Sequence, residues 1–180
     1  MNNAQSVIDD LQQLASPEKA ALSQGFFRTG KGEYAEGDIF LGITVPEQRK
    51  VVRKYRDLAQ TEIRKLLESA IHEERLVALL ILVDQFSHGD QTKQRVIYDL
   101  YLKSTKHINN WDLVDTSADK IVGSFLLDKP REKLYELARS PNLWEKRIAI
   151  VATYIFIRND QFTDTIAICE ILIQDKYDLI

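Results

Sequence analysis

The sequence of 180 residues contains only one cysteine, four prolines and seven glycines. The lone Cys169 cannot close a disulfide within the chain, so a disulfide framework is excluded. Few glycines and prolines favour long helices over a β architecture rich in turns. No segment shows the alternating polar and apolar pattern that predicts a half-buried strand. We therefore expect an all-α protein with a single domain, residues 1–180.

Long hydrophobic runs and a secretion signal are also missing. The longest apolar run, residues 76–83, is less than half of the roughly 20 residues that a membrane-spanning helix needs. Residues 1–5 lack the basic start and the apolar core of a signal peptide. We expect a cytoplasmic protein with no membrane partner.

The sequence lacks a strong positive charge and the spacing of a metal site. Its net charge is −3, which argues against a protein that coats nucleic acid nonspecifically, although a local basic face could still bind it. His72, His88 and His107 show no metal-ligand spacing with one another or with Cys169, so no metal site is expected. Motifs of serine and cysteine nucleophiles are absent too.

Residues 108–115 place an aromatic side chain and a carboxylate at the start of a predicted helix. Asn109 or Asn110 can cap this helix, which should continue as far as Leu126. Trp111 and Asp115 are four residues apart and would project from one face. An indole beside an acid could contact a cation or an electron-poor sugar. Alternatively, Trp111 lies in the core and Asp115 pairs with a nearby Lys or Arg.

Helical periodicity covers most of the remaining chain. Further helices are predicted at residues 3–15, 17–27, 61–69, 72–86, 91–104, 133–139, 143–157 and 162–174. Thr44-Val45-Pro46-Glu47 fits a capping box and starts another helix. That helix carries the most basic stretch of the chain, with Arg49, Lys50, Arg53 and Lys54. These cations form either a solvated helix face or a surface that binds a phosphate backbone.

The only glycine-rich segment is residues 29–38. A Walker loop needs Lys and then Ser or Thr after its last glycine. Here Gly37 is followed by Asp38, which would repel a phosphate. We interpret the segment as a surface loop.

Two helices share a sequence pattern. Ile71-His72-Glu73-Glu74-Arg75-Leu76-Val77-Ala78 resembles Leu143-Trp144-Glu145-Lys146-Arg147-Ile148-Ala149-Ile150, and the two arginines are 72 residues apart (147 − 75). This offset corresponds to two repeats of about 36 residues each, a period typical of the helix pairs of α-solenoids. Equivalent helices of a solenoid line one concave wall, so Trp111, Asp115 and Arg147 could converge there.

Three motifs carry a resemblance to a known family. Asn110-Trp111-Asp112-Leu113-Val114-Asp115, Asn142-Leu143-Trp144-Glu145-Lys146-Arg147 and Phe40-Leu41-Gly42-Ile43-Thr44-Val45-Pro46 together resemble the AlkD-type DNA alkylation-repair glycosylases. The resemblance spans nearly the whole chain. It implies a superhelical solenoid of HEAT-like antiparallel helix pairs whose concave surface holds duplex DNA. It also implies excision of N3- and N7-alkylated purines from double-stranded DNA, with no metal or organic cofactor.

The resemblance also implies roles for particular residues. By position, Trp111, Asp115 and Arg147 match the family's functional Trp, Asp and Arg, and Phe27 approximates an aromatic residue near the lesion. The cations Arg49, Lys50, Arg53 and Lys54 are candidates for DNA backbone contacts. Asn110 departs from the family, since some members have a second Trp there.

The family continues beyond Ile180 into a helix that bears another Trp of the lesion site. We therefore expect that the C-terminal repeat is missing from this chain. This departure leaves an alternative open, in which the chain is a catalytically silent HEAT-like scaffold that binds DNA or a protein partner. We expect a monomer.

Overall fold

The computed structural model describes residues 2–180, in which every regular element is a helix and loops connect the helices. Within that range there is no β-strand, only an isolated parallel bridge between Ile39 and Ile71. The prediction of an all-α fold is confirmed, whereas the superhelical solenoid of HEAT-like pairs stays a prediction. No helix in the described part of the chain is long and apolar enough to cross a membrane. The chain divides into two compact units, residues 1–85 and 86–180.

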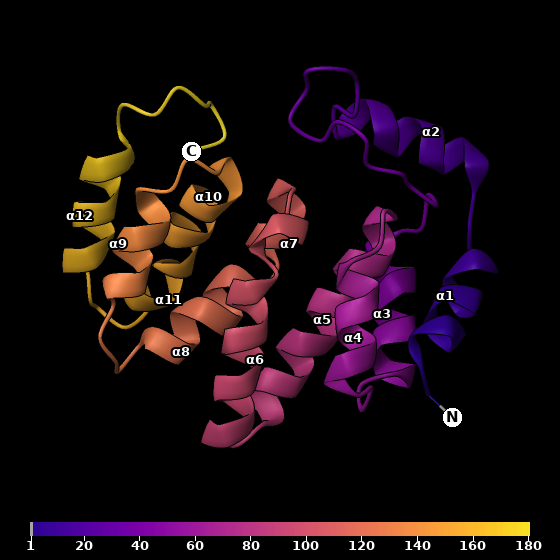
Figure 1. The fold of residues 1–180 in the computed structure, drawn as a ribbon, viewed down its shortest axis with the longest axis horizontal. Helices are drawn as coiled ribbons and strands as arrows, with labels where there is room; N and C mark the ends of the chain where they lie inside the picture. The colour runs from indigo at the N-terminus through magenta and orange to yellow at the C-terminus, as the bar shows by residue number, and fades with distance from the viewer. Residues whose placement is uncertain (1) are drawn as a thin grey trace. The chain divides into compact units, whose positions relative to one another are not determined.

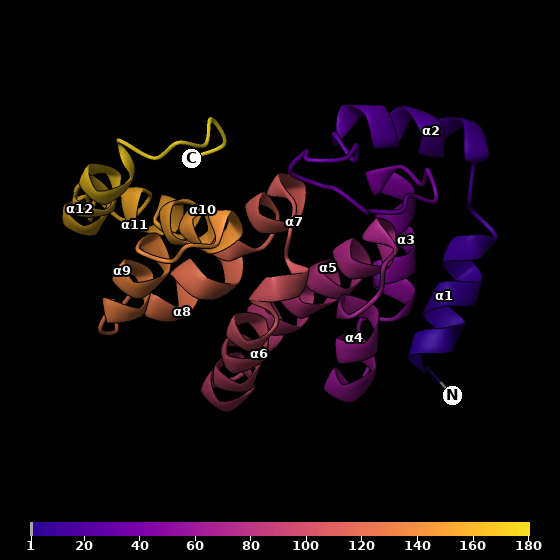
Figure 2. The ribbon, with the colours of Figure 1, turned by 45° about the horizontal axis from the view of Figure 1, so that its top comes forward.

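The first unit contains the N-terminal helices (Figure 1). They are α1 (Ala4–Gln12), α2 (Pro17–Phe26), α3 (Val45–Lys54), α4 (Gln60–Leu67) and most of α5 (His72–His88). Helix α1 packs against α3 and α4, as Figure 2 also shows. Val7, Leu11 and Ile63 are fully buried in this unit, because their spacing places them on the inner faces of α1 and α4.

Local capping signals explain where these helices begin. The Ser16 side chain caps α2 by accepting a hydrogen bond from the backbone N–H of Lys19, and Pro17 occupies the first helical position. At the start of α3 the Glu47 carboxylate accepts hydrogen bonds from the backbone N–H of Thr44 at 3.0 Å and from its hydroxyl at 2.6 Å. The predicted starts of both helices are confirmed.

A close approach between chain segments requires glycine at position 42. Gly42 has φ of +78°, and a Cβ there would lie 2.3 Å from the carbonyl oxygen of Ser16. The buried Glu73 side chain holds this segment by accepting hydrogen bonds from the backbone N–H groups of Leu41, Gly42 and Ile43. Glu73 thereby satisfies three donors that would otherwise be left without a partner inside the unit.

The second unit contains the remaining elements (Figure 1). They are α6 (Gln91–Lys103), the 3-10 turn η1 (Thr105–His107), α7 (Trp111–Asp115), the π-helical turn η2 (Asp119–Gly123), α8 (Ser124–Leu126), α9 (Glu132–Ala138), α10 (Leu143–Ala152), α11 (Tyr154–Ile157) and α12 (Thr163–Leu172). Helices α9, α10 and α12 pack against one another. Gly123 permits η2 to approach α10, since a Cβ there would lie 2.1 Å from the carbonyl oxygen of Ala152.

The helix predicted to run from Trp111 to Leu126 is interrupted, so that prediction was wrong in its extent. The hydroxyl of Thr116 donates to the carbonyl of Asp112 at 2.7 Å, and the hydroxyl of Ser117 donates to the carbonyl of Leu113 at 2.5 Å. These bonds compete with the backbone ladder, and a π-helical turn follows. The helix predicted at 143–157 is likewise divided at Thr153, whose hydroxyl donates to the carbonyl of Ile150.

Candidate active site

Helix α7 presents the predicted indole and carboxylate. Asn110 is its N-cap, and its side-chain oxygen accepts a hydrogen bond from the backbone N–H of Trp111 at 2.8 Å. Leu113 and Val114 are buried, which anchors the opposite side of this short helix in the core. Trp111 and Asp115 are only partly buried and lie one helical turn apart. Trp111 is therefore not a fully buried core residue, whereas the other part of that alternative, pairing of Asp115 with a nearby arginine, is what the structure shows.

The side chain of Asp115 forms a bidentate ion pair with Arg147 of α10. The Nε of Arg147 donates to Oδ1 at 2.8 Å, and Nη2 donates to Oδ2 at 2.7 Å. Helix α10 is capped by Asn142, whose side chain accepts from the backbone N–H of Trp144 at 2.8 Å, and it packs against α7. The planar guanidinium fork therefore fixes the orientation of the carboxylate plane.

The ion pair remains open to solvent on one side. The side chain of Asp115 is 36% exposed and that of Arg147 is 20% exposed. The Nη1 of Arg147 also donates to the backbone carbonyl of Leu179. Three of the five N–H groups of a guanidinium are used in this way, which leaves two for another acceptor such as a phosphate oxygen.

A buried hydrogen bond between Tyr101 and Ser117 lies directly after the C-terminal end of α7. The hydroxyl of Tyr101 lies 3.0 Å from the hydroxyl of Ser117, and both side chains are fully buried. Burial raises the pKa of Tyr101 well above its ordinary value, so this tyrosine remains protonated. No sequence motif indicates this pair, because its two members lie 16 residues apart.

The repeated sequence pattern reappears as a repeated ion pair. Arg75, which precedes Arg147 by one full offset, donates through Nη2 to Asp38 at 2.7 Å. In this pair both side chains are only 4% exposed, and Nδ1 of His72 lies 3.1 Å from the same carboxylate. Burial raises the pKa of Asp38, but hydrogen bonding to His72 and the charge of Arg75 outweigh it, so this pKa lies below its ordinary value.

The position of Asp38 corrects one interpretation made from the sequence. The segment 29–38 is a loop with several exposed residues, as predicted, but Asp38 is buried and faces Arg75 and His72. Its charge is compensated within the first unit, so it does not act as an exposed repulsive group. The last residue of the loop instead binds His72 and Arg75 of α5.

The four basic residues on α3 are exposed, and one of them, Lys54, forms an ion pair. Arg49, Lys50 and Arg53 are exposed and form no ion pair with any residue between 2 and 180. We refer to these three residues as the α3 basic face. Lys54 pairs with Asp10 at 2.6 Å, and hydrogen bonding to that carboxylate raises the pKa of Lys54. Lys54 is therefore a weaker candidate for a phosphate contact than the α3 basic face.

The predicted aromatic contact Phe27 belongs to a stack of rings. It lies parallel to Phe40 with centroids 5.0 Å apart and 5.2 Å from the ring of His72. Its neighbour Phe26 meets it edge-on at 5.0 Å and is 66% exposed. Phe26 therefore presents the larger accessible ring at the end of α2. Phe26 could not be chosen over Phe27 from the sequence, because two adjacent aromatic residues give no sign of which one is buried.

No group of three or more His, Cys, Asp or Glu side chains that could hold a metal ion exists among the described residues. The site is thus composed of one aromatic ring, one carboxylate and one guanidinium, all in the second unit. An oriented carboxylate can stabilise developing positive charge or activate a water molecule.

Comparisons with known proteins identify the family of the chain and its fold. Residues 7–180 match the sequence model of the family described as "DNA alkylation repair enzyme". Among solved structures, the chain is similar to the "Predicted DNA alkylation repair enzyme from Enterococcus faecalis", with a TM-score of 0.64 over 92% of this chain and 77% of the other. The two sequences are 14% identical, so this likeness shows the fold alone. No match was found among curated proteins.

Proposed function

Because this chain belongs to the family of DNA alkylation repair enzymes, we propose that it is a DNA glycosylase for N3- and N7-alkylated purines in duplex DNA. The observation that carries the proposal is the bidentate pair between Asp115 and Arg147, beside the partly exposed Trp111. The proposed reaction is hydrolysis of the bond between the base and deoxyribose.

The chemistry of the substrate explains why a single carboxylate suffices. Alkylation at N3 or N7 leaves a formal positive charge on the purine, so the base departs as a neutral group and needs no general acid. Sugar hydrolases use a second acid because their leaving group must be protonated. What remains to be stabilised is a sugar with oxocarbenium character, and an anion near that sugar lowers the barrier.

Asp115 is the proposed anion, and it also positions or deprotonates the attacking water. Trp111 would lie against the deoxyribose or the lesion, where its π face favours positive charge. Arg147 positions Asp115 through its fork and has two N–H groups left for a phosphate beside the lesion. This division of roles needs no metal and no organic cofactor.

The first unit would supply sequence-independent affinity for DNA. Cations that contact phosphates release counterions, which gives binding without base recognition. The α3 basic face suits this role because its three side chains are exposed and unpaired among residues 2–180. At the end of α2, Phe26 is a better candidate than Phe27 for an aromatic contact with a base or sugar, because more of its ring is accessible.

The decisive test is release of 7-methylguanine or 3-methyladenine from methylated duplex DNA under single-turnover conditions. Asp115→Asn keeps the shape of the side chain and removes its charge, so we expect a loss of about 10²- to 10³-fold in rate. Asp128→Asn changes an exposed carboxylate of the same unit and should leave the rate unchanged. Absence of release at high enzyme concentration, with salt-dependent duplex binding retained, would instead identify a silent DNA-binding scaffold.

A further inference from the structure

One carboxylate joins three segments that surround the proposed catalytic residues. The hydroxyl of Thr105, in η1, donates to Oε1 of Glu145 at 2.7 Å, and the hydroxyl of Ser140 donates to Oε2 at 2.5 Å. Thr105 is buried and Glu145 is partly buried. Hydrogen bonds to a charged acceptor are stronger than those between neutral groups. Glu145 therefore links η1, the loop before α10 and α10 itself.

Thr105 begins the segment that leads into α7. Ile108 and Asn110, which lie between Thr105 and Trp111, are fully buried, so this short segment has a fixed course. Helix α7 has only five residues, and a helix of that length is not stable by its own hydrogen bonds. Its position therefore depends on contacts with its neighbours. The bond from Thr105 to Glu145 connects its N-terminal side to α10.

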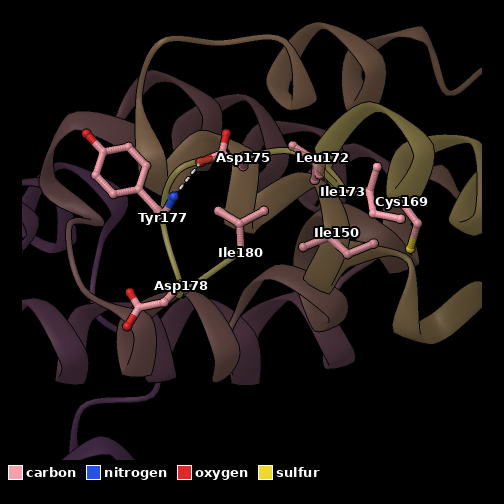
Figure 3. A pocket seen from close by; sticks show the side chains of 8 residues that line it. All are labelled: Ile150, Cys169, Leu172, Ile173, Asp175, Tyr177, Asp178 and Ile180. Carbon is pink, nitrogen blue, oxygen red and sulfur yellow. Dashed lines mark hydrogen bonds between the residues drawn. The ribbon is translucent and has the colours of Figure 1, made fainter.

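Helix α10 is packed against several neighbours and can serve as a fixed support for this bond. It contacts α7, α9 and α12. Further along the helix, Ile150 lines a pocket together with residues of α12 and of the segment 175–180 (Figure 3). Arg147 follows Glu145 by two residues, so the acceptor for Thr105 and the partner of Asp115 belong to the same helix. A shift of α7 relative to α10 would change the geometry between Asp115 and Arg147 directly.

The equivalent glutamate of the first unit makes a similar contact. Glu73 precedes Glu145 by 72 residues (145 − 73), the same offset as that between Arg75 and Arg147. Its carboxylate binds the backbone of residues 41–43, which lead into α3. In each unit the glutamate two residues before the arginine thus holds a segment that leads into an earlier helix. This recurrence favours a positioning role over an incidental contact.

We propose that Thr105 and Glu145 are positioning residues for the excision reaction, an inference that rests on the proposed function. Their bond holds the N-terminal side of α7 to α10, so that Asp115 keeps its orientation towards Arg147 and Trp111 stays beside it. In this role neither Thr105 nor Glu145 touches the substrate. Reacting groups must be held within a fraction of an ångström of the productive geometry, so loss of the bond should lower the rate more than the affinity for DNA.

The first experiment compares Thr105→Val with Thr105→Ser in single-turnover excision of 7-methylguanine from methylated duplex DNA. Valine has the shape of threonine without its hydroxyl, and serine restores the hydroxyl. Thr105→Val should lower the maximal rate about tenfold, less than the about 10²-fold that a displacement of about 1 Å costs. The enzyme concentration at half-maximal rate should not change. Thr105→Ser should keep most of the wild-type rate, and Thr105→Val should have no further effect in the Asp115→Asn background.

Ser104→Ala is the matched control for the loss of a hydroxyl. The hydroxyl of Ser104 donates to the carbonyl of Leu100 at 2.8 Å, so this bond does not reach α10 and its loss should leave the rate unchanged. Glu145→Ala removes the acceptor and should slow excision at least as much as Thr105→Val. It provides the same test if thermal melting shows Thr105→Val to be unfolded. A rate for Thr105→Val equal to that of Ser104→Ala would overturn the proposal.

The second experiment does not depend on excision. The Nε–H group of Arg147 bonds to Asp115 and can be followed by proton–nitrogen correlation NMR, with its signal assigned by its loss in Arg147→Lys. Thr105→Val should shift this signal, whereas Thr105→Ser and Ser104→Ala should leave it in place. An unchanged signal in Thr105→Val overturns the positioning role and leaves the proposed function intact. A shifted signal without excision by the wild type supports the contact between α7 and α10 and contradicts only the proposed function.

Discussion

Replacing Arg147 by Lys tests whether the guanidinium works by orienting Asp115. Lysine keeps the positive charge but offers a single ammonium group, so it cannot make the two parallel bonds of 2.8 and 2.7 Å. The bond to the carbonyl of Leu179 disappears as well, because one ammonium cannot reach both acceptors in the geometry of the fork. The carboxylate then gains rotational freedom while the local charge is unchanged.

The expected cost differs between stability and rate. The pair is partly exposed, so loss of its hydrogen bonds should lower the free energy of unfolding by about 1–2 kcal/mol. For a chain of this size such a change lowers Tm by about 5 °C. A carboxylate misplaced by about 1 Å, however, costs about 10²-fold in the rate of the chemical step. We therefore expect a variant that remains folded at assay temperature but excises slowly.

The assay compares single-turnover excision of 7-methylguanine by wild type, Arg147→Lys, Asp115→Asn and the double variant. If Arg147 acts through Asp115, the double variant should be about as slow as Asp115→Asn alone, because the two residues work as one unit. Arg158→Lys is the control, since Arg158 is 63% exposed and pairs with Asp119 in the same unit. Multiplication of the two single effects would refute the positioning role and leave the phosphate contact as the contribution of Arg147.

Three further predictions concern stability and DNA binding. Gly123→Ala places a Cβ 2.1 Å from the carbonyl oxygen of Ala152. It should lower the free energy of unfolding, measured by urea titration, by about 2–4 kcal/mol. Gly25→Ala on α2 is the control, because its Cβ would meet nothing within 4 Å and should not destabilise the protein. Substitution of the α3 basic face by glutamine should reduce the slope of log binding constant against log salt by about 0.9 for each phosphate that the protein no longer neutralises, and an unchanged slope would remove α3 from the DNA interface. Burial raises the pKa of Tyr98 from 10.0 to about 12, so the unfolded chain loses this proton first as the pH rises. The contribution of Tyr98 to stability is therefore complete below about pH 10 and is lost between about pH 10 and 12, and Tyr98→Phe should make the unfolding free energy less dependent on pH there.

Where the helices begin could be predicted from short-range chemistry. The starts of α2, α3 and α10 follow from Ser16, Thr44 with Glu47, and Asn142, whose capping groups act within three residues of the backbone that they satisfy. Membership in the repair family could also be predicted, because its motifs are contiguous in sequence.

What could not be predicted depends on partners distant in sequence. The helix after Trp111 is interrupted where Ser117 bonds to Leu113 and meets Tyr101, and no local signal indicates a tyrosine at that point. Asp38 is buried because Arg75 lies 37 residues further along and supplies a compensating charge. Periodicity identifies which residues share a helix face, but it does not reveal which faces will meet. The proximity of Asp115 and Arg147, by contrast, could be predicted, because the repeat and the family resemblance linked two motifs that lie 32 residues apart. Their direct ion pair was not predicted, since Arg147 was expected to bind a phosphate.

The two Asp–Arg pairs differ in their access to water. The effect of losing the arginine can therefore be compared between a buried pair and a partly exposed pair in the same protein. Asp38 and Arg75 share the chemistry of Asp115 and Arg147 but are enclosed on all sides. Loss of Arg75 would leave an uncompensated charge inside a packed unit, which costs about 3–5 kcal/mol and should show itself as unfolding. Loss of Arg147 leaves a carboxylate that solvent already reaches. It should therefore lower the rate of the proposed reaction more than the free energy of unfolding. The same pair of residue types thus occurs twice in a single chain, once where water is excluded and once where water can reach the carboxylate.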